Sequence, residues 1–261
     1  MTSTHDRART LWPIVLITGS SRGIGAEIAR TLAGAGAAVA INYVRDADSA
    51  RAVADSIIAH GGTADTFAAD VAVPEEAAGL VARVVGRFGA LHTLVNNAGV
   101  YASSTLEQSD SALVARVFGV NLIGLIAATR AAAPHLIAAA AQSPPGTASI
   151  INITSVAARA HWGGAAVYCA SKAAAEALTR CHAAELGPKG VRVNAVAPGV
   201  TETDITRAGM TPEFRKKVSE ETKLGRVGEV RDIAPMVAFL ASPAAAWITG
   251  QVIDADGGFK T

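Results

Sequence analysis

The chain has 261 residues, half of them hydrophobic and 17% charged, and its 23 basic and 22 acidic residues give a formal net charge of +1. This balance leaves no strong field directed at nucleic acid or at an anionic membrane, so we expect a small-molecule partner. The length predicts one domain over residues 1–261. The N-terminal extension, 1–12, is polar, and no isolated apolar span follows, so we expect a cytoplasmic protein. Cys169 and Cys181 indicate neither a disulfide framework nor a metal site.

Short runs rich in β-branched residues alternate with longer segments of helical periodicity. The expected strands are 14–17, 38–42, 64–69, 93–96, 149–153, 191–196 and a last one near 251–254. The expected helices are 24–35, 47–60, 75–88, about 110–140 and 165–186. This alternation predicts an α/β fold with a doubly wound parallel sheet of about seven strands and helices on both faces.

Two segments interrupt the alternation. Residues 142–147 contain two prolines and a glycine, which is typical of a turn that only links a helix to a strand. Residues 198–223 are long for a loop in a compact domain, and their charged part from 213 to 223 has the composition of a short helix. We therefore expect 198–223 to form a lid over the functional site.

The first predicted strand ends in the turn Thr18-Gly19-Ser20-Ser21-Arg22-Gly23-Ile24-Gly25. Glycine accepts positive φ angles and lets the backbone approach a ligand closely, and the helix that follows offers its N-terminus to phosphate. The spacing is G-x-x-x-G-x-G, not the G-x-G-x-x-G of many dinucleotide folds. Taken alone, the turn leaves a phosphate site and an ordinary turn both open.

Tyr168 and Lys172 lie four residues apart in a predicted helix, so their side chains project from one face. A phenol with a pKa near its usual value of about 10 is a poor acid or base at neutral pH, and a nearby ammonium favours the phenolate. The pair is therefore a candidate acid/base. The same spacing also occurs on ordinary solvated helix faces, so the pair does not settle the question by itself.

Together these motifs resemble the short-chain dehydrogenase/reductase family over nearly the whole chain, from Ile14 to Gly258. The turn from Thr18 to Gly25 resembles the family's cofactor turn, and Asn96-Asn97-Ala98-Gly99 resembles its signature after the fourth strand. Residues at the positions of its catalytic tetrad are Asn121, Ser155, Tyr168 and Lys172. Residues 198–199 with Thr203 resemble its nicotinamide-binding turn, and 248–251 with 256–258 resemble its C-terminal signature. The resemblance implies a single Rossmann-type domain and an NAD(P)-dependent oxidoreductase.

The resemblance also implies how a nicotinamide dinucleotide would be held. The backbone from Gly19 to Ile24 would surround the pyrophosphate, 97–99 would lie beside the adenosine ribose, and Asp70 with Val71 would meet the adenine. The full implied set is Gly19, Ser21, Arg22, Gly23, Ile24, Gly25, Asn42, Tyr43, Arg45, Asp70, Val71, Asn97, Ala98, Gly99, Tyr168, Lys172, Pro198, Gly199, Thr201 and Thr203. We expect Asn96 mainly to tie the fourth strand to its neighbour, and Asp70 is equally suited to a turn.

The choice between NAD and NADP is made where the second strand ends, because an acidic side chain there binds the ribose 2′-hydroxyl and repels a 2′-phosphate. The chain has Asn42-Tyr43-Val44-Arg45 at this place, without an acid. Arg22 and Arg45 are both candidates for the phosphate. We therefore favour NADP(H). NAD(H) remains open if Asp46 or Asp48 reaches the ribose instead.

In the mechanism that the resemblance implies, a ketone oxygen accepts hydrogen bonds from Ser155 and Tyr168 while hydride arrives from the nicotinamide. Tyr168 acts as general acid, and Lys172 lowers its pKa and binds the nicotinamide ribose. Asn121 would hold a water that links the lysine to solvent; alternatively, it is a buried amide with only a structural role.

The substrate is less defined. Candidate pocket residues are Tyr101, His161, Trp162, Met210 and Phe214, which are mostly apolar. Residues 224–228 and 232–234 are most similar to the 3-oxoacyl-[acyl-carrier-protein] reductase branch of the family. Dehydrogenases of alcohols, sugars or polyols, reductases of aromatic or polyketide ketones, and a non-catalytic dinucleotide sensor remain alternatives. The resemblance also implies a homotetramer.

Overall fold

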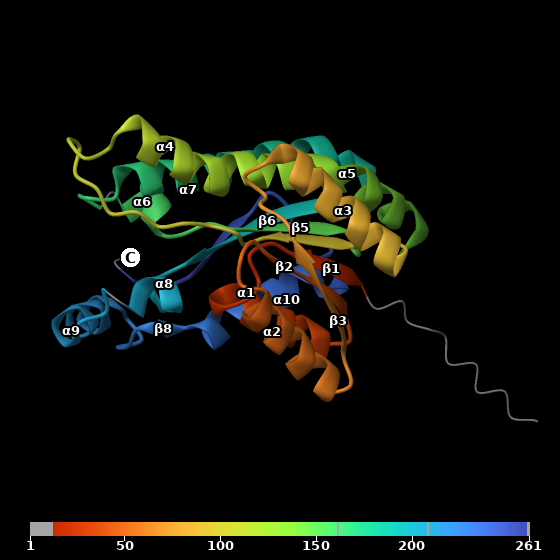
Figure 1. Ribbon diagram of the computed structural model, residues 1–261, viewed down its shortest axis with the longest axis horizontal. Helices are drawn as coiled ribbons and strands as arrows, with labels where there is room; N and C mark the ends of the chain where they lie inside the picture. The colour runs from red at the N-terminus through yellow and green to blue at the C-terminus, as the bar shows by residue number, and fades with distance from the viewer. Residues whose placement is uncertain (1–12, 161, 208, 260–261) are drawn as a thin grey trace, which may run out of the picture.

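The structure is a computed structural model that describes residues 13–160, 162–207 and 209–259; the extension expected at 1–12 lies outside them. The strands of its main sheet are β1 (Ile14–Ile17), β2 (Ala38–Tyr43), β3 (Thr63–Ala68), β4 (Thr93–Asn96), β5 (Ser149–Ile153), β6 (Arg192–Pro198) and β9 (Val252–Ala255). They form a seven-stranded sheet in the order β3-β2-β1-β4-β5-β6-β9, and each pairing is parallel (Figure 1). The predicted doubly wound, Rossmann-type sheet is confirmed.

Helices cover both faces of this sheet (Figure 1). One face carries α1 (Gly23–Gly34), α2 (Ala47–Ala59) and α10 (Val230–Ala241), and the other carries α3 (Pro74–Phe88), α4 (Ser111–Phe118), α5 (Leu125–Gln142) and α7 (Ala166–Leu186). Ile28 of α1 and Leu240 of α10 are fully buried in one core cluster, and Leu80 of α3 and Leu136 of α5 in the other. The apolar stripe of each helix therefore packs on strands whose side chains are buried on both faces.

The site is positioned by the order of the strands. β1 pairs with β2 on one side and with β4 on the other. The chain therefore turns toward opposite edges of the sheet after β1 and after β4, and the loops that follow these two strands diverge. In an open parallel sheet this arrangement leaves a crevice at the carboxyl ends of the strands, where ligands bind.

The helix expected over about 110–140 is interrupted. Between α4 and α5, residues Gly119–Gly124 form a π-helix, η1, which contains Asn121. Gly124 lies so close to Val71 that a Cβ on the glycine would be 3.0 Å from Val71 Cγ2. Hydrophobic periodicity does not register the one extra residue of a π-turn, so the sequence reads as one continuous helix.

The segment expected to be a lid contains more structure than a single short helix. It holds strand β7 (Thr201–Glu202) and helices α8 (Asp204–Arg207) and α9 (Pro212–Glu221), and β7 pairs with β8 (Gly228–Glu229). Thr211 caps α9 by accepting a hydrogen bond from the Phe214 amide, 3.2 Å. Short elements complete the described fold: α6 (Ala157–Ala160), η2 (Gly187–Lys189) and η3 (Pro243–Ala245).

One stretch, Ser111–Gln142, is long and apolar enough to cross a membrane by length and composition, although the sequence analysis found no such span. In the fold, its α5 part lies on the sheet, and Ala128, Ala132 and Leu136 are fully buried there. Core helices of soluble proteins pass the same test of length and apolar composition. Outward-facing residues of the same stretch, Ile123 and Ile126, are 44% and 36% exposed.

Candidate active site

A cleft of about 1220 Å³ opens at the carboxyl ends of the central strands. Small-molecule pockets are typically about 300–1000 Å³, so this one has room for a dinucleotide and a second molecule. Each residue of the implied cofactor set lines it except Gly25. Ser155, Tyr101, Trp162 and Phe214 line it as well. Residues far apart in the sequence are thus gathered along one cleft.

The glycine turn after β1 is built to hold an anion. Gly19 and Gly23 have φ angles of +61° and +57°, which side chains other than glycine rarely adopt. Arg22 precedes α1 as its N-cap, but its side chain makes no capping hydrogen bond, and the first turn carries no acidic residue. The N–H groups at the start of α1 therefore keep their binding capacity and their positive dipole end for a ligand. A dinucleotide pyrophosphate fits this chemistry.

Two asparagine side chains, Asn42 and Asn97, hold this turn in shape. The Asn97 amide donates to the carbonyls of Thr18 and Gly19, each at 2.9 Å, and the Gly19 N–H donates to Asn42 Oδ1 at 3.0 Å. A Cβ on Gly25 would collide with the Asn97 amide, which explains why this glycine packs under the turn instead of lining the cleft. The amides of Asn42 and Asn97 are thus engaged by the protein, and they act on a ligand through the backbone that they hold.

At the end of β2, the cleft is lined by Arg22, Tyr43, Arg45 and Asp46. The Asp46 carboxylate caps α2, accepting hydrogen bonds from the Ser49 amide at 2.9 Å and from its hydroxyl at 2.7 Å. These bonds, together with the charge of Arg22, lower the pKa of Asp46 below its usual value. No ion pair engages Arg22 or Arg45 within the described part of the chain. This end of the cleft therefore offers two guanidinium groups to a ligand, whereas the Asp46 carboxylate is already engaged as the cap of α2.

Asp70 combines the two roles that the sequence left open. It lines the cleft, and its Oδ1 accepts a hydrogen bond from the Ala72 amide at 2.9 Å, which makes a turn. Asn96 is buried and donates to Asn152 Oδ1 at 2.9 Å, which ties β4 to β5 as expected.

Tyr168 and Ser155 meet in the middle of the cleft. Both side chains line it, and the Tyr101 ring packs edge-on against Tyr168 with centroids 5.1 Å apart. Ser155 lies two residues after the end of β5, and its hydroxyl accepts a hydrogen bond from the Ala157 amide at 3.2 Å. Burial raises the pKa of Tyr168 to about 12, although Ser155 acts in the opposite direction. The phenol is therefore protonated at neutral pH.

Lys172 is buried one turn below Tyr168, with its Nζ 5.9 Å from the tyrosine ring centroid. The ammonium donates a hydrogen bond to the Ile153 carbonyl at 2.9 Å, and burial lowers the pKa of Lys172 to about 8. From the sequence, Lys172 is expected to lower the pKa of Tyr168. In the structure the pKa of Tyr168 is raised mainly by desolvation, and Lys172 is not among the groups that shift it.

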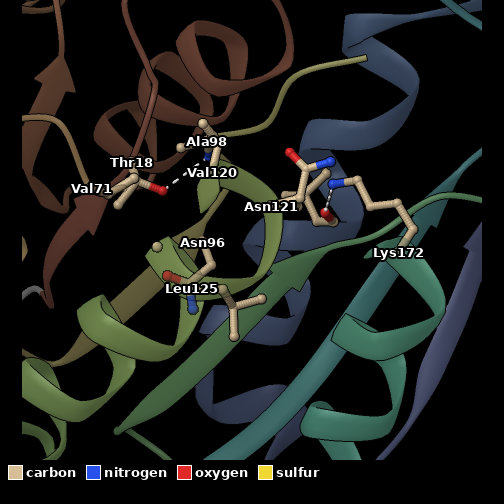
Figure 2. A pocket seen from close by; sticks show the side chains of 10 residues that line it. Thr18, Val71, Asn96, Ala98, Val120, Asn121, Leu125 and Lys172 are labelled. Atoms are coloured by element: carbon tan, nitrogen blue, oxygen red, sulfur yellow. Dashed lines mark hydrogen bonds between the residues drawn. The ribbon is translucent and has the colours of Figure 1, made fainter. Parts of the chain in front are cut away.

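Asn121 lies beside this pair on η1, at a small cavity of about 10 Å³ that Lys172 also lines (Figure 2). Its Oδ1 accepts from the Val100 N–H at 2.8 Å, and its amide donates to the Val100 carbonyl and to Ser171 Oγ, each at 3.0 Å. The amide is thus bonded to another loop and to α7, and not to its own helix. The cavity volume is close to what one water molecule needs.

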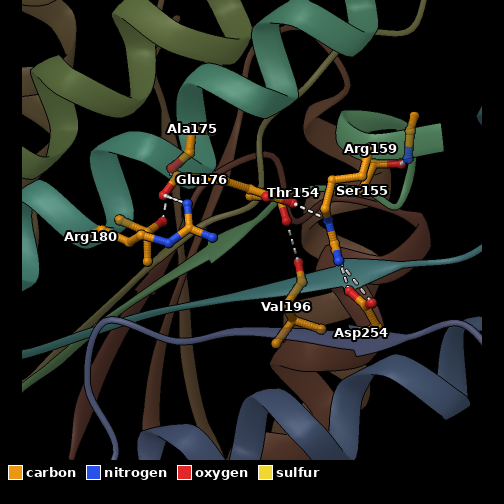
Figure 3. A network of polar contacts seen from close by, with 10 residues as sticks. Thr154, Ser155, Arg159, Ala175, Glu176, Arg180, Val196 and Asp254 are labelled. Carbon is orange, nitrogen blue, oxygen red and sulfur yellow. Dashed lines mark hydrogen bonds and ion pairs between the residues drawn. The ribbon is translucent and has the colours of Figure 1, made fainter. Parts of the chain in front are cut away.

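A further polar network lies behind the site, and sequence reasoning missed it (Figure 3). Arg159, on α6 just after Ser155, forms a bidentate pair with Asp254 of β9. Its Nε lies 3.3 Å from the carboxylate of Glu176, which is buried one turn beyond Lys172 on α7. Burial raises the pKa of Glu176, while Arg159 and Arg180 act to lower it. The network ties the segment after Ser155 to the helix that carries the tyrosine and lysine.

The lid side of the cleft is aromatic. Trp162 packs edge-on against Phe259 at 6.1 Å between ring centroids, and Phe214 is 44% exposed on α9. Met210, expected in the pocket, instead packs on a small core cluster that contains Val218 and is not among the residues lining the cleft. His161 lies outside the described residues. The described residues contain no cluster of His, Cys, Asp or Glu suited to a metal.

Comparison with known proteins agrees with this geometry. The family profile described as Enoyl-(Acyl carrier protein) reductase matches residues 19–260. The chain is 43% identical to an uncharacterised oxidoreductase of Methylorubrum extorquens, covering 95% of this chain and 97% of that one. It is 38% identical to the 3-oxoacyl-[acyl-carrier-protein] reductase of Staphylococcus epidermidis, with coverages of 93% and 97%. A short-chain dehydrogenase from Burkholderia cenocepacia, solved in complex with NADP, superposes with a TM-score of 0.88 at 37% identity, with coverages of 95% and 98%.

Proposed function

The chain belongs to the short-chain dehydrogenase/reductase family of oxidoreductases, and on that basis we propose that it reduces a ketone to a secondary alcohol with NADPH. The observation that carries the proposal is that Ser155 and Tyr168 line the same cleft as the uncapped N-terminus of α1. One end of the cleft suits a pyrophosphate, and the other presents two hydroxyls to a carbonyl oxygen.

The bound nicotinamide would supply the hydride. As negative charge develops on the substrate oxygen, Ser155 and Tyr168 donate hydrogen bonds to it, and Tyr168 transfers its proton as general acid. With a pKa of about 12 in the cofactor-free protein, the phenol holds its proton ready but needs help to release it. The Lys172 ammonium stabilises the phenolate left behind, and the cavity beside Asn121 suits a water through which the proton is replaced.

The preference for NADPH rests on Arg22 and Arg45, which line the cleft at the end of β2. A guanidinium binds phosphate through two parallel hydrogen bonds, so either side chain suits a 2′-phosphate. The alternative is that Asp46 or Asp48 holds the 2′-hydroxyl of NADH. It is disfavoured because the Asp46 carboxylate caps α2 and Asp48 is not among the residues that line the cleft. The NADP bound to the Burkholderia relative is consistent with the same choice.

The substrate class proposed first is a 3-oxoacyl thioester, in line with the acyl-carrier-protein reductase among the relatives. The long, aromatic cleft accommodates an acyl chain. We propose further that the chain folds as one domain, that 198–223 closes over the substrate as a lid, and that the enzyme works in the cytoplasm as a homotetramer. The exposed apolar residues on α4 to α5, such as Ile123 and Ile126, support contact with a second copy.

The test is the change in nicotinamide absorbance with NADPH, and then NADH, over a panel of 3-oxoacyl thioesters, diketones, cyclic ketones, quinones and sugars. The same measurement with NADP⁺ and NAD⁺ uses alcohols, polyols and sugars. Turnover of one class with NADPH supports the proposal. Turnover of an alcohol or sugar alone, with oxidised cofactor, would replace the reductase by a dehydrogenase. NADPH binding with no turnover of any compound would favour a dinucleotide sensor.

A further inference from the structure

The lid helix α9 presents one face to the cleft. Phe214, Lys217, Val218 and Glu221 line the cleft, and their spacing of three, four and seven residues places them on one side of the helix. Val218 is buried in one apolar cluster with Val156, the residue that follows Ser155. This packing holds α9 over the reacting end of the cleft.

The three successive basic residues of α9 differ in their partners. Arg215 pairs with Glu202 at 2.9 Å, and Lys216 with Glu220 at 3.9 Å. Lys217, which lines the cleft, forms no ion pair or hydrogen bond with a carboxylate in the described part of the chain. It is the member of the run that lines the cleft, and no ion pair with another described residue balances its charge.

Other charged side chains also line the cleft. Asp204 pairs with Arg207 at 3.0 Å. Glu221 lies one turn beyond Lys217 on the same face of α9, and Arg116 of α4 adds a guanidinium. The rings of Tyr101, Trp162 and Phe214 are among the lining side chains. The outer cleft is therefore an aromatic slot with an ammonium at its edge, which suits an apolar molecule that carries an anionic group.

We propose that Lys217 binds an anionic group of the substrate, a carboxylate or a phosphate, while the carbonyl lies at Ser155 and Tyr168. The inference rests on the proposed function, because it uses the same reacting end of the cleft. An ammonium on a flexible stem recognises either anion as a point charge, and it selects charged over neutral ketones of the same shape.

The experiment compares matched ligands that differ only in charge. One pair is 3-oxooctanoic acid and its methyl ester, and the other is the 3-oxooctanoyl thioester of phosphopantetheine and of pantetheine. Binding to the protein loaded with NADP⁺ is measured by calorimetry, so that the result does not depend on turnover. Tighter binding of the acid than of its methyl ester identifies a free carboxylate as the anion. Tighter binding of the phosphopantetheine thioester than of the pantetheine thioester identifies a phosphate of the carrier type.

In the parent protein the charged member of one pair should bind about tenfold more tightly than the neutral member. Lys217→Gln should abolish that difference while leaving the neutral ligand within about twofold, and Lys217→Arg should retain it. Lys216→Gln is the matched control, because its side chain is paired on the helix surface. Arg116→Gln tests a basic side chain on α4 that also lines the cleft.

Equal binding of charged and neutral ligands by the parent, binding of neither, or an unchanged preference in Lys217→Gln would overturn the inference. Loss of the preference in Arg116→Gln alone would place the anion against α4 and would also overturn it. The proposed function is judged separately, by NADPH oxidation with the neutral ligands. If these are reduced and no charge preference exists, only the assignment of Lys217 fails.

Discussion

Replacing Lys172 by methionine tests the desolvation on which the description of the catalytic pair depends. The lysine side chain is 6% exposed, and burial lowers its pKa from 10.5 to about 8. The difference corresponds to about 3 kcal/mol by which burying the ammonium disfavours the folded state. Methionine keeps the length of the apolar stem and removes the charge. It also removes the hydrogen bond to the Ile153 carbonyl, worth about 1 kcal/mol.

The sign follows from proton binding in the two states. At pH 7 the lysine is protonated in the folded and the unfolded chain, so the full penalty is present. As the pH rises from 8 toward 10.5, the folded chain releases the proton first, and the stability of the parent rises relative to the variant. The raised pKa of Tyr168 lowers stability above pH 10 in both proteins and therefore largely cancels in the comparison.

The assay is urea unfolding of both proteins without cofactor, at one protein concentration, at pH 7 and pH 10. We expect Lys172→Met to be more stable than the parent by about 2 kcal/mol at pH 7, and to lose that advantage at pH 10. The exposed residue Lys189 supplies the control, since Lys189→Met should show no such pH dependence. A difference between Lys172→Met and the parent that is the same at both pH values would refute the reasoning.

Three further changes test other parts of the site. Arg45→Ala should weaken NADPH about tenfold and NADH little, because it removes charge-assisted hydrogen bonds to the 2′-phosphate; an unchanged ratio of the two affinities in titration would contradict this. Gly25→Ala should lower the free energy of unfolding by about 1–3 kcal/mol and weaken dinucleotide binding, because its methyl collides with the Asn97 amide; parental stability on thermal melting would show that the turn adapts. Arg159→Ala should cost about 1–3 kcal/mol at pH 8 and less at pH 5, because the buried Glu176 carboxylate loses its cation and is relieved by protonation; the same loss at both pH values would argue against the ion pair.

Much of the fold is encoded locally and could be predicted. The apolar run Ile14–Ile17 identifies β1, because a central strand is buried on both faces of the sheet. The alanine-rich pattern after it identifies α1, because this helix is buried on one face only. The π-helix around Asn121 could not be predicted, since it differs from an α-helix by one residue and is supported by the close contact between Gly124 and Val71. That contact joins segments far apart in the chain.

In the site, too, the features that depend on neighbouring residues could be predicted, and those that depend on distant contacts could not. The glycine turn and the spacing of Tyr168 and Lys172 are readable in sequence, because both depend on neighbouring residues. The directions in which the pKa values of Tyr168 and Lys172 shift could not be predicted, because desolvation is a property of the packed cleft. The pairing of Arg159 with Asp254 crosses 95 residues and leaves no local signal. Met210 was misplaced because alternation along an irregular lid does not tell which side faces the cleft.

The most direct test of the central claim, proton donation by Tyr168 during hydride transfer, is NADPH oxidation by the parent and by Tyr168→Phe with the same ketone. Phenylalanine keeps the ring that packs against Tyr101 and removes only the hydroxyl that would donate the proton. The rate should fall by about 10²–10⁴-fold while NADPH affinity stays nearly the same. Equal rates in the two proteins would mean that the proton comes from another group and that the mechanism is wrong.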